Sequence, residues 1–86
     1  MNSQINAQAI TDSVTRIVNQ HLQSSTEIKQ TDSLKERGMD SIQCMRIIVE
    51  LENEFNIEIE DEDLLIEKYE NINTITELVN RLVAKI

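Results

Sequence analysis

The chain has 86 residues, with one glycine, no proline, no tryptophan and a formal net charge of −8 at pH 7. A chain of this size buries about 60 to 65% of the surface that its unfolded form exposes, so it builds one modest core and has little material for the walls of a catalytic cleft. The sequence therefore predicts a single domain over residues 1–86, with an ordered core at about 7–85, that is not an enzyme.

Charge and cysteine content indicate the expected surroundings. Nucleic acid binding requires clustered Lys and Arg, and this chain has 8 such residues against 16 Asp and Glu, so we expect basic proteins and no nucleic acid as partners. Cys44 alone can form no internal disulfide, which is typical of the reducing cytoplasm. No segment resembles a membrane span or a secretory signal. We expect a cytoplasmic, unprocessed protein without membrane contact, and the high net charge favours a monomer.

The negative charge is concentrated in one part of the chain. Residues 50–70 contain ten carboxylates and one cation, Lys68, whereas residues 1–49 are nearly balanced. A solvated face that aids solubility and a docking surface for basic partners both explain such a run, and the sequence leaves both open. The acids at 58–63 lack the spacing and the turn glycine of a calcium loop, so no metal site is predicted.

Apolar residues at three- and four-residue steps predict a first helix at about 7–23. Its stripe consists of Ile10, Val14, Ile17, Val18, His21 and Leu22. His21, at the edge of this stripe, has no obvious acid or cysteine partner in the sequence and is interpreted as a surface or cap residue. Residues 24–40 are rich in turn formers and predict a long functional loop. Three apolar residues are expected to anchor this loop to the core: Ile28, Leu34 and Met39.

A second helix is predicted from Ser41 or Ile42 to about Phe55. Its buried stripe consists of Ile47, Ile48, Leu51 and Phe55. Asp40 is the candidate N-cap, because a carboxylate there accepts hydrogen bonds from free backbone amides and the helix dipole favours its charge. Gly38, the only glycine, predicts a tight backbone position that a side chain would obstruct. A second apolar stripe lies on another side of the same helix, rotated from the first. We interpret it either as more core or as a surface for partners. It consists of Ile42, Met45 and Val49.

A short third helix is predicted at about 61–69, beginning at Asp61 or Glu62. Its apolar residues are Leu64, Leu65 and Ile66. The alternation of residues 56–63 resembles a strand, but no second strand is predicted to pair with it, so we interpret it as a loop. Its inward residues are Ile57 and Ile59.

A last helix is predicted from Thr74, because Thr74 and Glu77 match the capping box. Its buried stripe consists of Ile75, Leu78, Val79, Leu82 and Val83. Together the four segments predict an all-α fold, a four-helix bundle with three longer helices and one short helix.

The most informative residues are Gly38, Asp40, Ser41 and Ile42, at the start of a helix that ends in an acidic stretch and Phe55. They are similar to the Gly-x-Asp-Ser-Ile/Leu motif of acyl and peptidyl carrier proteins, and the resemblance extends over nearly the whole chain. It implies that 4'-phosphopantetheine from coenzyme A is esterified to Ser41 and that its thiol carries an acyl or aminoacyl group as a thioester. A helix N-terminus, with free amides and a positive dipole end, suits such a phosphodiester.

The resemblance also implies roles and partners. Asp40 resembles the family acid that helps a phosphopantetheinyl transferase orient its metal and substrate. The other implied partners are a loading ligase or transferase for the acyl or aminoacyl group and downstream synthase or tailoring enzymes. Two alternatives have other consequences: a carrier-like interaction module that is never modified, in which Ser41 only caps the helix, and a small hydrolase, for which His21 is the sole candidate base.

Two positions depart from the carriers of bacterial fatty acid synthesis, whose second helix is acidic near the attachment serine. Gln43 and Arg46 stand where carboxylates are expected, and acid returns only at Glu50, Glu52 and Glu54. A changed charge on a docking surface alters partner choice, so we expect a pathway of polyketide or nonribosomal peptide type, with fatty acid synthesis as the alternative. Arg46 either reads partners or pairs with Glu50 one turn later. The expected partner-binding residues are Ile42, Met45, Arg46, Val49, Glu50 and Glu52.

Overall fold

The computed structural model describes residues 7–22 and 26–84, which form three α-helices and two 3-10 helices. The elements are α1 (Ala7–Leu22), α2 (Ser41–Phe55), η1 (Asp61–Asp63), η2 (Ile66–Tyr69) and α3 (Ile72–Val83). Within these two ranges no strand occurs, so the predicted all-α class with three longer helices is confirmed. The described part contains no helix that is long and apolar enough to cross a membrane.

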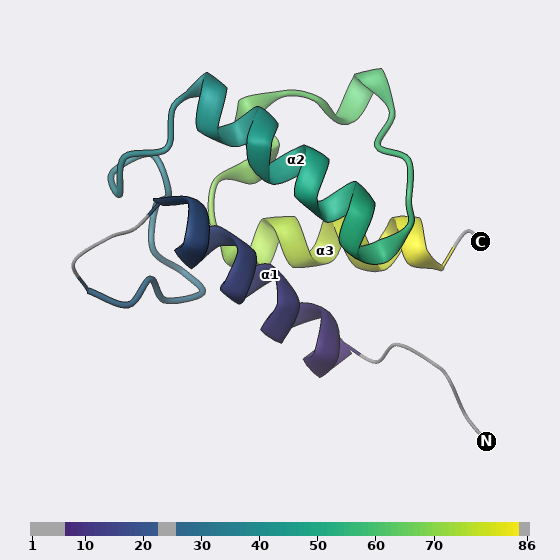
Figure 1. The fold of residues 1–86 in the computed structure, drawn as a ribbon, viewed down its shortest axis with the longest axis horizontal. Coiled ribbons are helices and arrows are strands. Elements are labelled where there is room, and N and C mark those ends of the chain that lie inside the picture. Colours follow the sequence, from purple (N-terminus) through teal and green to yellow (C-terminus); the bar gives the residue numbers. More distant parts are fainter. Residues whose placement is uncertain (1–6, 23–25, 85–86) are drawn as a thin grey trace.

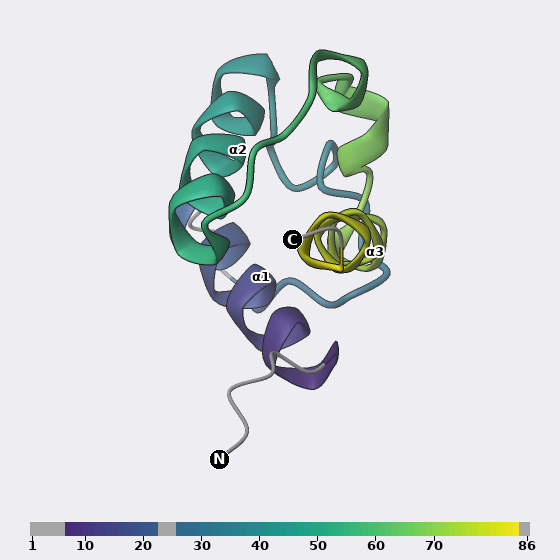
Figure 2. The same ribbon diagram turned by 90° about the vertical axis from the view of Figure 1, so that its right-hand side faces the viewer.

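The three longer helices pack around a shared interior. α1 contacts both α2 and α3, and η2 contacts α3 and α2 (Figure 1). Figure 2 looks nearly along α3, with α1 and α2 to its left and the η1–η2 segment above it. The core therefore lies between α1, α2 and α3, and η2 closes one side of it.

The apolar stripes that the sequence predicts are the faces that meet in this core. Helix α1 ends at Leu22, and the residue at which we expected it to end, 23, lies outside the described residues, as does residue 85. Burial of each large apolar side chain contributes about 1.5–3 kcal/mol, so these stripes are the main stabilising feature of the fold. The buried apolar residues of the three helices are Ile10, Val14, Ile17, Val18, Cys44, Ile47, Ile48, Leu51, Phe55, Ile72, Ile75, Leu78, Val79 and Leu82.

The described part of the long loop, residues 26–40, is irregular, but hydrogen bonds, an ion pair and buried side chains fix its position. The Arg37 guanidinium donates to the carbonyls of Thr26 and Glu27 and forms an ion pair with Asp32 at 2.8 Å. Backbone hydrogen bonds join the loop to the beginning of α3: Leu34 N–H to the Glu70 carbonyl and Asn73 N–H to the Gln30 carbonyl. The three predicted anchors, Ile28, Leu34 and Met39, are all buried.

The prediction of one continuous helix at about 61–69 is wrong. The segment instead forms η1 and η2, separated at Leu65, whose backbone is extended with φ −97° and ψ 129°. The predicted start at Asp61 or Glu62 is confirmed, since η1 begins at Asp61; the preceding residue, Glu60, makes no side-chain capping hydrogen bond. The loop interpretation of the preceding residues is confirmed, since Ile59 is buried and Ile57 packs half-buried against the core.

Burial in this segment does not follow its apolar residues. Leu65 and Ile66, two of the residues on which the helix prediction was based, are 50% and 40% exposed, whereas Asp63 and Tyr69 are buried. The Asp63 carboxylate accepts a hydrogen bond from Lys68 Nζ at 2.7 Å and faces Arg81 at 3.2 Å, and its carbonyl accepts the Tyr69 hydroxyl at 2.7 Å. The hydrogen bond from Lys68, with that from Arg81, lowers the pKa of Asp63. Burial raises the pKa of Tyr69.

Helix α3 begins at Ile72, two residues before the predicted Thr74. Asn71 is the N-cap: its side chain accepts from Thr74 N–H at 2.8 Å, and the Thr74 hydroxyl accepts from Asn71 N–H at 3.2 Å. A capping box is therefore present, but Thr74 occupies its third helical position rather than its cap. Glu77 has no part in it.

We expect Asp63→Asn to lower the free energy of unfolding by about 2 kcal/mol, because hydrogen bonds to charged groups are worth about 1.5–3 kcal/mol. Asp61→Asn, at an exposed acid two residues earlier, should change it by less than about 0.5 kcal/mol. Urea denaturation at pH 7 measures both. An equal loss in the two variants would contradict the role of Asp63.

The Asp63 effect should also depend on pH. The pKa of Asp63 is lower in the folded chain than in the unfolded one, so its contribution is present above the unfolded pKa and is lost as the pH falls through the folded pKa. Wild type and Asp63→Asn should therefore converge in stability in acid, and urea midpoints measured from pH 7 downwards test this.

Candidate functional site

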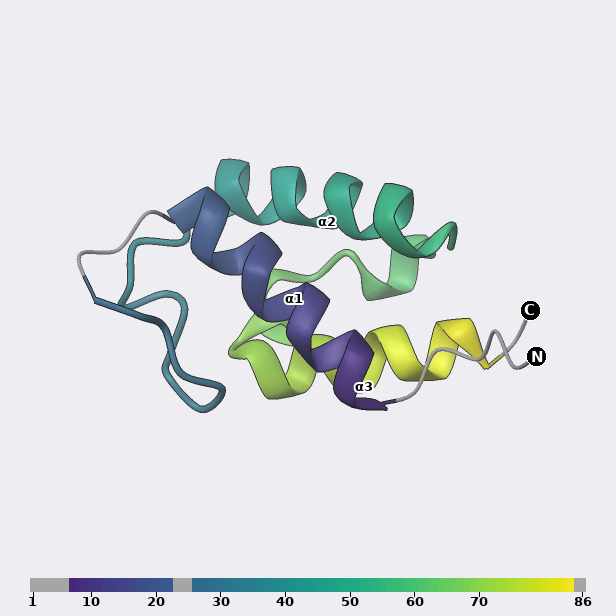
Figure 3. The same ribbon diagram turned by 60° about the horizontal axis from the view of Figure 1, so that its bottom comes forward.

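Ser41 is the first residue of α2, and its side chain is exposed. In Figures 1 and 3 this end of α2 lies where the 26–40 loop reaches the helices, close to the C-terminal end of α1. The predicted position of Ser41 at a helix start is confirmed. Its hydroxyl is therefore open to a macromolecular partner.

Asp40 is the N-cap of α2, as predicted. Its backbone is extended, and its Oδ1 accepts a hydrogen bond from Gln43 N–H at 2.8 Å, while its carbonyl accepts Cys44 N–H. Within residues 7–22 and 26–84, the amides of Ser41 and Ile42 have no hydrogen-bond acceptor. These two amides and the positive end of the helix dipole form a setting that fits a phosphate ester on the Ser41 hydroxyl.

Gly38 closes the turn that leads into this helix. Met39 N–H donates to the Leu34 carbonyl at 2.9 Å and Gly38 N–H to the Lys35 carbonyl at 3.1 Å, which is the Schellman arrangement. Gly38 has φ +101°, a conformation that favours glycine. A Cβ at this position would meet no atom within 4 Å, so the predicted obstruction of a side chain is wrong and the backbone conformation is the reason for glycine. The turn directs the chain out of the core into α2.

Two different surfaces meet at Ser41. On one side a groove of about 610 Å³ separates the start of α2 from η2, with Met39 and Tyr69 buried beneath it. Among the other residues that line it are Lys35, Asp40, Ile66 and Glu70. On the other side a mainly apolar surface runs along α2. It is lined by His21, Ser41, Ile42, Met45, Arg46 and Val49.

The sequence predicted the surface along α2 but missed the groove. Helical periodicity places Ile42 and Val49 together, whereas the groove depends on how η2 packs, which the sequence misjudged. The only available signal was Tyr69, the single tyrosine of the chain. Its hydroxyl needs a partner when buried, and it finds the Asp63 carbonyl.

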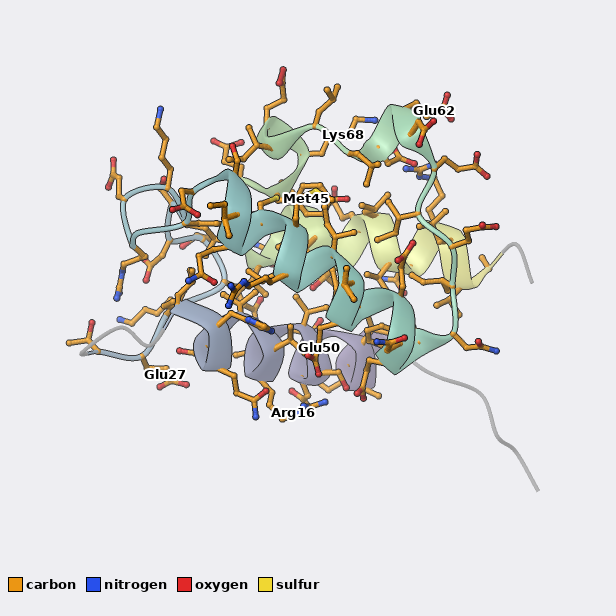
Figure 4. The ribbon with its side chains drawn as sticks, turned by 45° about the horizontal axis from the view of Figure 1, so that its top comes forward. Arg16, Glu27, Met45, Glu50, Glu62 and Lys68 are labelled. Carbon is orange, nitrogen blue, oxygen red and sulfur yellow. The ribbon has the colours of Figure 1, made fainter. Side chains whose placement is uncertain are left out.

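The structure separates the expected partner-binding residues into two groups. Ile42, Met45 and Val49 are 64%, 47% and 52% exposed and lie on one surface with Arg46. Glu50 and Glu52 lie on the flanks of α2 and have partners within the chain. Figure 4 shows Met45 on the flank of α2 away from α1 and Glu50 on the side towards α1.

Glu50 pairs with His21, whose Nε2 lies 3.5 Å from Glu50 Oε1. No acidic partner of His21 is obvious in the sequence, because Glu50 is distant along the chain and comes close only through the packing of α1 on α2. The alternative pairing of Arg46 with Glu50 is not formed. Glu52 Oε2 accepts a hydrogen bond from Ile59 N–H at 2.9 Å.

Two groups near Ser41 bear on the hydrolase alternative, the Cys44 thiol and the candidate base His21. Cys44, one turn into α2, is buried, and burial raises the pKa of its thiol. Within the described ranges the Ser41 hydroxyl has no hydrogen-bond partner, so no hydrogen bond there joins it to His21.

We expect Asp40→Ala to lower the free energy of unfolding by about 1 kcal/mol, since it removes the cap on Gln43 N–H. Asp40→Asn keeps an oxygen that can accept this hydrogen bond and should stay within about 0.5 kcal/mol of wild type. Thermal and urea unfolding of the pair measure the difference. Equal destabilisation by Ala and Asn would show that charge rather than capping is responsible.

Comparison with known proteins gives a consistent result. The family model described as "Phosphopantetheine attachment site" matches residues 12–82. Proteins named acyl carrier protein from Chlorobium phaeobacteroides, Chlorobium phaeovibrioides and Chlorobium luteolum are each 38% identical over 63 residues, which cover 73% of this chain and 70% of each relative. A crystal structure of an acyl carrier protein from Thermotoga maritima superposes with a TM-score of 0.72 and 20% identity over 98% of both chains, a likeness of fold.

Proposed function

Because the chain belongs to the acyl carrier protein family, whose members carry covalently attached 4'-phosphopantetheine, we propose that Ser41 is its attachment residue. The observation that carries this proposal is an exposed hydroxyl at the start of α2, next to two amides without acceptors in the described part of the chain. The bound group supplies a thiol that holds an acyl or aminoacyl group as a thioester. The chain itself holds the phosphate end, where α2 begins.

In this role the chain has no catalytic group of its own. The unactivated Ser41 hydroxyl and the buried Cys44 support this reading. Chemistry is left to the partners that act on the arm and its cargo: a phosphopantetheinyl transferase, a loading ligase or transferase, and downstream synthase or tailoring enzymes. The single reduced cysteine fits a cytoplasmic setting.

The proposed pathway is a specialised one, of polyketide or nonribosomal peptide type. Gln43 and Arg46, close to Ser41 on α2, support this choice, since the charge of a docking surface selects partners. Fatty acid synthesis is the second candidate, and the Chlorobium relatives named acyl carrier protein fit it.

Charging of the phosphopantetheinylated protein by a malonyl transferase of fatty acid synthesis separates these two pathways. For a specialised carrier we expect kcat/KM at least about tenfold below that of the enzyme's own carrier, the change that about 1.4 kcal/mol produces. Radiolabelled malonyl transfer measures it. Equal rates would favour fatty acid synthesis.

Intact-protein mass tests the attachment residue directly. After incubation with coenzyme A, magnesium and a broad-specificity phosphopantetheinyl transferase, we expect wild type to gain one phosphopantetheine and Ser41→Ala to gain none. Ser33→Ala, at a second serine that lines the groove, is the matched control and should be modified like wild type.

Two results of the mass measurement would contradict the proposal, each in a different way. No gain by wild type with several transferases would reject the carrier role and favour the interaction module. A gain by Ser41→Ala would place the arm on another residue. Circular dichroism of the three proteins verifies that the variants are folded.

A further inference from the structure

The outward side of α2 is a single row of exposed residues. Ile42, Arg46, Val49 and Asn53 follow each other at steps of four, three and four, which on an α-helix places them within a sector of about 60°. All four are exposed. We call these four residues the outer stripe; Met45 lies next to it on the side away from Glu50.

The carboxylates of α2 are turned away from the outer stripe and are engaged within the chain. Glu50 faces His21 at 3.5 Å, and Glu54 pairs with Arg16 at 3.1 Å, so both acids contact α1. Figure 4 shows Glu50 and Arg16 on the facing sides of α2 and α1. Glu52, on the opposite flank, accepts the amide of Ile59. The three acids therefore flank the outer stripe and are engaged within the chain, while the Glu50 and Glu54 side chains stay 42% and 34% exposed.

Arg46, unlike these acids, has no partner for its side chain in the described part of the chain. Its side chain is exposed, and within residues 7–22 and 26–84 the guanidinium forms no ion pair and no hydrogen bond. Its neighbours on the stripe, one turn away on either side, are Ile42 and Val49. The outer stripe thus presents two large apolar side chains and one charge, and that charge is positive.

We propose that the transferase that modifies Ser41 docks on α2 and offers apolar contacts to Ile42 and Val49 and a carboxylate to Arg46. The inference rests on the proposed carrier function. A guanidinium between apolar side chains is suited to a two-pronged hydrogen bond with a carboxylate in a water-poor contact. A partner with Lys or Arg at this point would bring like charges together, which is costly at an interface.

The net charge of −8 does not contradict this sign. The exposed acids at Glu58, Glu60, Asp61 and Glu62 lie near η1, beyond the end of α2 that is distant from Ser41 (Figures 1 and 4). Interactions between exposed charges are largely screened beyond about 8–10 Å at physiological salt. The acids near η1 therefore do not set the charge at Arg46. The nearer carboxylates are Asp40, which caps Gln43 N–H, and Glu50, which faces His21.

The test uses the phosphopantetheinyl transferase of the source organism with coenzyme A and the full chain. The kcat/KM for modification is measured for wild type, Arg46→Gln, Arg46→Glu and Lys29→Glu, the last an equal charge reversal at an exposed residue of the 26–40 loop. We expect a loss of about threefold for Arg46→Gln and about tenfold for Arg46→Glu, with Lys29→Glu within about twofold of wild type. The losses should shrink in 0.5 M NaCl.

A compensating change completes the test. Changing to Lys the transferase carboxylate that contacts Arg46, found by scanning acids around its active site, should restore modification of Arg46→Glu and impair that of wild type. If wild type is modified but Arg46→Glu reacts equally fast or faster, or no such rescue exists, the inference is overturned while the carrier function stands. If no transferase modifies wild type, the carrier function fails and the inference with it.

Discussion

The position at which α2 begins is the constraint on which the rest of the structure depends. The residues before α2 determine where the chain enters the helix, and the turn of 100° per residue then places Ile47 and Leu51 together on the face that meets the core. Two local features fix the start: the left-handed turn at Gly38, which buries Met39, and the Asp40 cap on Gln43 N–H. The same features expose the Ser41 hydroxyl. Core packing and access to the site therefore follow from one boundary.

How far the sequence predicts this structure depends on whether local pattern or distant contact decides each part. Helices α1 and α2 and the loop anchors were predictable, because helical periodicity and N-caps depend on residues that are close together in the sequence. The segment from 61 to 71 was not. Its path depends on Asp63, which reaches Lys68 and, eighteen residues away, Arg81, while Leu65 and Ile66 remain exposed. The periodicity of apolar residues cannot predict that a carboxylate such as that of Asp63 is buried.

The site divides in the same way. The motif at residues 38–42 identified Ser41 and Asp40, and helical spacing grouped Ile42 with Val49. Which acids of α2 remain available to a partner could not be predicted, because their partners His21, Arg16 and Ile59 belong to other parts of the chain. Composition indicated an acidic protein with basic partners. Tertiary pairing leaves the helix beside Ser41 with a positive charge facing outward, so net charge is a poor guide to the sign of one face.

Ser41 belongs to both surfaces of the site, the groove against η2 and the apolar face of α2. A group attached to its hydroxyl can therefore turn to either side while α2 keeps its place in the core. The groove side is held by Tyr69, which fills the interior and hydrogen-bonds to Asp63, and Asp63 in turn binds Lys68 and Arg81. The α2 side is held by the contacts of Glu50 with His21 and of Glu54 with Arg16, both on α1. Because the two surfaces rest on separate sets of contacts, a change on the outer stripe can alter partner recognition without disturbing the groove, and a change at Asp63 can loosen the groove without altering the charge that α2 presents.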